Sequence, residues 1–124
     1  MATALVVDDS SVMRRILRKM LTELGFDVRE AENGRQALAL LAKEPAPVSL
    51  SLVDWNMPEM DGLELLKHLR SNPELGAMVV IMVTSDTELA HIAQALEAGA
   101  NEYVMKPFTR DILVSKLELA GVQV

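Results

Sequence analysis

Several side chains able to do chemistry stand directly after short apolar runs of the sequence: Asp8, Asp9, Asp54, Thr84 and Lys106. Each alone has an ordinary explanation, because Asp and Thr often cap the helix that follows a strand and lysines are common on surfaces. Three carboxylates brought together, however, repel one another and destabilise a fold unless a positive charge compensates them. The set therefore predicts an acidic, cation-holding site, provided that the fold gathers these residues.

The surrounding sequence predicts alternating strands and helices. Apolar runs rich in Val, Ile and Leu alternate with stretches whose apolar residues recur every three or four positions. The expected strands are residues 4–7, 27–31, 48–53, 78–83 and 102–105, each followed by an amphipathic helix. Among the helix residues expected to face the core are Ile16, Leu89, Leu96 and Ile112.

This alternation predicts an α/β fold and one domain over residues 1–124. Right-handed crossovers would place helices on both faces of a parallel five-stranded sheet. We expect the flavodoxin-like strand order 2-1-3-4-5, in which the ligand crevice lies beyond the carboxyl ends of the strands, between the first and the third. The five polar side chains would converge on that crevice.

The convergence predicts a magnesium site that contains a nucleophile. Mg²⁺ takes one or two protein carboxylates and keeps waters and phosphate oxygens as its other ligands. We expect Asp9 and Asp54 as direct ligands, Asp8 acting through water, and a backbone carbonyl near Asn56 completing the protein's share. Because a carboxylate can attack phosphorus to give an aspartyl phosphate, the central Asp54 is the best candidate nucleophile.

Lys106 and Thr84 acquire roles in the same chemistry. An ammonium group and a hydroxyl donor can bind phosphoryl oxygens as charge develops on them. Asn56 lies two residues after Asp54 and Asp86 two residues after Thr84, so both can flank the path of an attacking water. We expect these two residues to tune how long the phosphate survives.

The same motifs resemble those of response regulator receiver domains of two-component signalling, most of all the CheY-like type of chemotaxis regulator. The resemblance spans the chain and rests on Leu5-Val6-Val7-Asp8-Asp9, Asp54-Trp55-Asn56-Met57-Pro58, Met60-Asp61-Gly62, Thr84 and Lys106-Pro107-Phe108. It implies that Asp54 is the phosphoacceptor, Asp8 and Asp9 the magnesium-binding pair, Thr84 the switch hydroxyl and Lys106 the phosphate-binding lysine.

The resemblance also implies a conformational switch. Tyr103 matches the switch aromatic, and the peptide bond before Pro107 is expected to be cis. On phosphorylation Thr84 would move toward the phosphate and Tyr103 would turn inward, a population shift that reshapes the face of the fourth helix, fifth strand and fifth helix. A half-buried edge aromatic is the alternative interpretation of Tyr103. The implied partners are a sensor histidine kinase and a downstream protein target.

Composition removes other classes of function. The net charge of −6 opposes binding to nucleic acid and to anionic lipid. No cysteine is present, so a thiolate metal site is excluded. No apolar run reaches the length of a membrane span, and we expect a cytoplasmic protein. His68 and His91, on predicted helices, are expected to be solvated bystanders rather than phosphocarriers.

The leading hypothesis is a signalling phosphoacceptor that catalyses only its own phosphorylation and dephosphorylation. Without room for an output domain, it would act by protein contact, on a flagellar motor or within a phosphorelay. One rival is a phosphatase of the haloacid dehalogenase type, which usually has a second aspartate where this chain has Asn56, and a cap domain. The other is a flavin binder, whose phosphate Asp8 and Asp9 would repel.

Overall fold

Strands and helices alternate along the described residues, 2–44 and 47–124, of the computed structural model. The strands are β1 Thr3–Val7, β2 Asp27–Ala31, β3 Val48–Val53, β4 Val79–Thr84 and β5 Glu102–Met105. The helices are α1 Ser11–Glu23, α2 Gly34–Lys43, α3 Gly62–Ser71, α4 Leu89–Glu97 and α5 Arg110–Leu119, with a short 3₁₀ turn at Pro73–Leu75.

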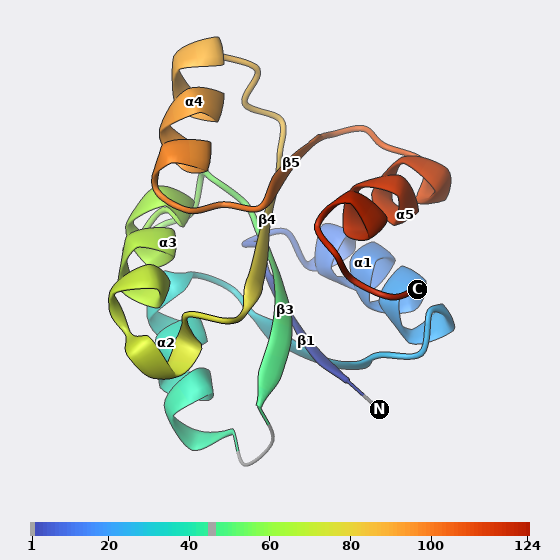
Figure 1. Cartoon of the computed structure of the whole chain (residues 1–124), viewed down its shortest axis with the longest axis horizontal. Coiled ribbons are helices and arrows are strands. Elements are labelled where there is room, and N and C mark those ends of the chain that lie inside the picture. The colour runs from blue at the N-terminus through green and yellow to red at the C-terminus, as the bar shows by residue number, and fades with distance from the viewer. Residues whose placement is uncertain (1, 45–46) are drawn as a thin grey trace.

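The five strands form one parallel sheet in the order β2-β1-β3-β4-β5. Helices α2, α3 and α4 cover one face of this sheet, and α1 and α5 cover the other (Figure 1). Each face buries its own apolar cluster, and the central strands supply residues to both. This arrangement confirms the predicted flavodoxin-like fold and strand order.

Short polar side chains cap the N-termini of α1, α2, α3 and α5. Ser10, Asn33, Asp61 and Thr109 each accept a hydrogen bond from the backbone N–H three residues later. Such caps satisfy donors that the first turn of a helix leaves without a partner. The caps therefore fix the residue at which each of these helices begins after the loop that follows its strand.

Four apolar residues predicted to face the core are instead exposed: Ile16 by 40%, Leu89 by 81%, Leu96 by 47% and Ile112 by 46%. A helix that packs on a sheet buries only a narrow stripe, and in α5 that stripe is Leu113 and Leu117. The predicted core faces were therefore too wide. Within the described residues, no helix is long and apolar enough to cross a membrane.

Candidate functional site

The carboxyl ends of four strands bring the predicted site residues together. Asp8 follows β1, Asp54 follows β3, Thr84 is the last residue of β4, and Lys106 follows β5. One carboxylate oxygen each from Asp8, Asp9 and Asp54 lie within 4.8 Å of one another. The predicted convergence of these side chains at one edge of the sheet is thus present in the structure.

Lys106 is the positive charge that faces the two buried carboxylates. Its Nζ lies 2.8 Å from Oδ2 of Asp8 and 3.4 Å from Oδ2 of Asp54. Asp8 and Asp54 are buried, whereas Asp9 is exposed. A buried charge is costly unless it is paired, so Lys106 offsets part of the repulsion within the acidic group.

Burial raises the pKa of the Asp54 carboxyl above its ordinary value of 3.8. The negative charge of Asp8 adds to this rise, while Lys106, the Thr84 hydroxyl and the Trp55 backbone N–H oppose it. That N–H donates to Oδ1 of Asp54 at 2.8 Å, which fixes the orientation of the carboxylate. Asp54 is thus a buried acid held in one orientation beside a cation.

Gly62 lets the start of α3 approach the backbone of Asp54 closely. The Gly62 N–H donates to the carbonyl of Trp55 at 2.8 Å. A Cβ at position 62 would collide with the backbone carbonyl of Asp54 and with Met82. Glycine is required here by space, since its φ is not in the left-handed region.

Thr84, Asp86 and Tyr103 form a chain of contacts that leads away from the acidic group. The fully buried Thr84 accepts at Oγ1 from the Asp86 N–H at 3.2 Å. The Tyr103 hydroxyl donates to the Asp86 carbonyl at 2.8 Å. With an exposure of 7%, Tyr103 is a buried rather than a half-buried aromatic, and burial raises its pKa to about 12.

Asn56 and Asp86, predicted to flank an attacking water, differ in their surroundings. Asn56 is exposed on the loop that follows Asp54. Both carboxylate oxygens of Asp86 are occupied: Oδ1 accepts from the Glu88 N–H at 3.0 Å, and Oδ2 lies 2.5 Å from Nδ1 of His91. Asp86 is therefore bound to the start of α4.

His91 is a residue near the site that the sequence interpretation missed. The sequence predicts a solvated bystander, but the His91 ring stacks on that of Trp55, the neighbour of Asp54. The ring centroids are 4.8 Å apart and the planes differ by 13°. The available signal was an acid just before a helix with a histidine on that helix's first turn.

The acidic group fits a magnesium ion. Asp8, Asp9 and Asp54 offer hard carboxylate oxygens close enough together to share one ion, and Mg²⁺ prefers such ligands. The exposed Asp9 leaves one side open to water and to a phosphate. The Lys106–Pro107 peptide bond is cis, as the sequence resemblance implied.

Comparisons with known proteins identify the family. The sequence model of one protein family, the response regulator receiver domain, matches residues 4–118 of this chain. The chain belongs to the response regulator receiver family. It is 51% identical over 115 residues to a chemotaxis protein CheY homolog of Campylobacter jejuni (strain 81-176), covering 92% of this chain and 88% of the relative. It is 47% identical over 116 residues to chemotaxis protein CheY1 of Helicobacter pylori (strain 26695), covering 93% of each.

The solved structures agree with this assignment. The chemotaxis response regulator CheY4 of Vibrio cholerae superposes with a TM-score of 0.88 at 32% identity, covering 97% of this chain and 98% of that one. The chain is therefore a CheY-like receiver domain of two-component signalling, a signalling phosphoacceptor class rather than a metabolic enzyme. The phosphatase and flavin-binder hypotheses are set aside. Receiver domains bind Mg²⁺ at an acidic cluster and interact with histidine kinases and downstream targets.

Proposed function

We propose that Asp54 accepts a phosphoryl group from a sensor histidine kinase. The observation that carries this proposal is the position of the Asp54 carboxylate, which is buried, 3.4 Å from the Lys106 ammonium and within reach of two further carboxylates. Asp8, Asp9, Asp54 and the backbone carbonyl of Asn56 would hold Mg²⁺. That ion neutralises charge on the phosphoryl oxygens and on the carboxylates when it is bound.

The transfer is a displacement at phosphorus. One oxygen of Asp54 forms a bond to phosphorus while the bond from phosphorus to the nitrogen of a phosphohistidine breaks. The departing imidazole keeps the electron pair and takes up a proton. Lys106 and the Thr84 hydroxyl then bind phosphoryl oxygens as charge develops on them, and catalysis lies mainly in positioning and charge.

The switch runs from Thr84 to Tyr103. Thr84 contacts the Asp86 backbone N–H, and Tyr103 contacts the Asp86 carbonyl. A movement of Thr84 toward a phosphate would therefore shift the Asp86 backbone and, with it, the partner of the Tyr103 hydroxyl. The inward, bonded Tyr103 would become the favoured state of the phosphorylated chain. This coupling is a shift between two packed states.

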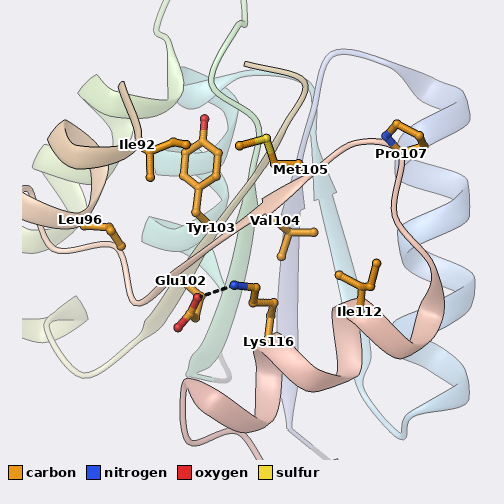
Figure 2. A pocket seen from close by; sticks show the side chains of 9 residues that line it. All are labelled: Ile92, Leu96, Glu102, Tyr103, Val104, Met105, Pro107, Ile112 and Lys116. Carbon is orange, nitrogen blue, oxygen red and sulfur yellow. Dashed lines mark hydrogen bonds and ion pairs between the residues drawn. The ribbon is translucent and has the colours of Figure 1, made fainter. Parts of the chain in front are cut away.

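The output surface is a groove between α4, β5 and α5 (Figure 2). Its volume is about 470 Å³, and its apolar lining consists of Ile92, Leu96, Tyr103, Val104, Met105, Pro107 and Ile112. Lys116 and Glu102 form an ion pair of 3.2 Å across its polar side. We propose that an apolar segment of the target protein, a flagellar motor component or a phosphorelay partner, binds here after phosphorylation.

A phosphorylation assay tests the proposed acceptor. The purified chain, incubated with Mg²⁺ and acetyl phosphate, should gain the mass of one phosphoryl group, and Asp54→Asn should not. Beryllofluoride with Mg²⁺ should bind the parent chain and not the variant. Equal modification of both proteins would contradict the proposal.

Two further measurements test the output groove and the role of Asp86. Ile112→Asp should weaken binding of the phosphorylated chain to its target without changing phosphorylation, whereas Leu119→Asp, an exposed change outside the groove lining, should not. Asp86→Ala should slow the decay of the aspartyl phosphate. An unchanged decay would contradict a role for Asp86 in hydrolysis.

A further inference from the structure

Each carboxylate oxygen of Asp86 already has a partner in this structure. Oδ1 is bound to the backbone of Glu88, and Oδ2 is bound to His91. The Asp86 side chain is only 11% exposed, so little water reaches it. The start of α4 therefore holds the carboxylate that could orient an attacking water.

His91 is itself fixed by a second contact. Its ring lies flat on Trp55, whose backbone N–H holds the Asp54 carboxylate. The other ring nitrogen, Nε2, lies 3.6 Å from Glu88. One imidazole thus links the start of α4 to the residue beside the phosphoacceptor.

We propose that His91 is a positioning residue that holds the Asp86 carboxylate away from the phosphoryl group and so lengthens the life of the phosphorylated state. The inference rests on the proposed phosphorylation of Asp54. Asp86 would promote hydrolysis only in the fraction of molecules in which His91 has released it.

The charges around the site agree with this arrangement. The pKa of His91 is raised, chiefly by its bond to Asp86, and that of Asp86 is lowered by its bonds to the Glu88 backbone and to His91. Asp86 is therefore electrostatically coupled to His91.

Four variants separate this role from simple packing. His91→Leu keeps an apolar side chain against Trp55 but removes the donor, whereas His91→Gln keeps a donor. His68→Leu is the matched control, because His68 is the second histidine and lies exposed on α3. Asp86→Ala is combined with His91→Leu to test whether His91 acts through Asp86.

Each protein is phosphorylated with acetyl phosphate and Mg²⁺, the donor is removed, and the decay of the aspartyl phosphate is followed. A positioned acid or base contributes about 10²–10⁴-fold to proton transfer, so even partial release of Asp86 should accelerate decay by at least about threefold in His91→Leu. His91→Gln and His68→Leu should decay like the parent chain. Asp86→Ala and the double variant should share one slower rate.

Two results would overturn the inference. One is an unchanged or slower decay in His91→Leu. The other is the same acceleration by His91→Leu when Asp86 is already alanine, because His91 would then act through Trp55 or α4. In both cases Asp54 is still phosphorylated, whereas failure of the proposed function would appear as a parent chain that takes no phosphoryl group at all.

Discussion

The ammonium nitrogen of Lys106 lies 2.8 Å from a carboxylate oxygen of Asp8, although 98 residues separate the two in the sequence. The contact joins the ends of β1 and β5, which are not neighbours in the sheet. It also places the positive charge 3.4 Å from Asp54. Lys106 therefore has a structural role in the unphosphorylated chain, before any phosphate is present.

Removing this charge should destabilise the fold. Lys106→Met leaves Asp8 and Asp54 buried without their cation, and breaking a buried pair costs about 3–5 kcal/mol. Because Lys106 is 17% exposed at its side chain, we expect a loss at the lower end of that range. Urea unfolding in EDTA measures it, and saturating Mg²⁺ should restore part of the loss.

Lys116→Met is the matched control. Lys116 pairs with Glu102 at 3.2 Å, but both side chains are much more exposed. Exposed pairs contribute about 0–1 kcal/mol. Equal losses in the two lysine variants would contradict the structural role of Lys106.

Asp54→Asn should make the unphosphorylated fold more stable at pH 7. Burial raises the pKa of Asp54, so the folded chain binds the proton more tightly than the unfolded chain does. Ionised Asp54 therefore costs stability at neutral pH, and stability rises as the pH falls through the raised pKa. We expect a gain of about 0.5–2 kcal/mol, the usual scale of a stabilising substitution.

Magnesium should make the parent chain more stable than Asp54→Asn, which reverses their order of stability in EDTA. A ligand at 100 times its Kd stabilises a fold by about 2.7 kcal/mol, and the parent chain should bind Mg²⁺ more tightly than Asp54→Asn does. Thermal unfolding of both proteins, in EDTA and in Mg²⁺, provides the measurement. If Asp54→Asn unfolded at a lower temperature than the parent chain in EDTA, the predicted gain in stability would be wrong.

The sequence predicted the strand ends well and the helix surfaces poorly. Asp8, Asp54 and Lys106 could be placed because parallel strands share one carboxyl edge, so topology alone brings them together. The exposure of Ile112 could not be predicted, because the spacing of apolar residues along a helix does not specify how wide its buried face is. The position of His91 depends on the rotation of α4 over Trp55, which no local pattern specifies.

Gly62→Ala should damage the site through the backbone. The new Cβ would overlap the carbonyl of Asp54, and a backbone atom cannot move aside as a flexible side chain can. Overpacking costs about 1–3 kcal/mol, and here it would also displace the phosphoacceptor. We expect a loss at the upper end of that range in urea unfolding, together with slower phosphorylation by acetyl phosphate.

Gly76→Ala provides the comparison, because its Cβ would lie 3.6 Å from the nearest atom, the carbonyl of Pro73. That spacing is ordinary van der Waals contact. The variant should keep the parent's stability and its phosphorylation rate. A Gly62→Ala protein that behaved like Gly76→Ala would show that α3 can move away from Asp54 without cost.

The pair of His91 and Asp86 should give the fold a defined pH dependence. The pKa of His91 is raised from 6.5, so its stabilising effect is complete below that value and is lost as the pH rises through the raised pKa. The pKa of Asp86 is lowered from 3.8, so its effect is complete above that value and is lost as the pH falls through the lowered pKa. The pair should therefore contribute most to the stability of the fold between pH 3.8 and pH 6.5, the ordinary pKa values of the two groups.

Urea unfolding of the parent chain and His91→Gln, from acid to mildly alkaline pH, tests this window. The stability difference between the two proteins should be greatest near the middle of the window and should shrink in alkaline buffer, where the imidazole is neutral. Trp55, the sole tryptophan, gives a second signal, because an imidazolium attracted to the indole face quenches its fluorescence. Emission should rise with pH in the parent and in His68→Gln, and stay flat in His91→Gln. A parallel rise in all three would mean that His91 does not stack on Trp55 in solution.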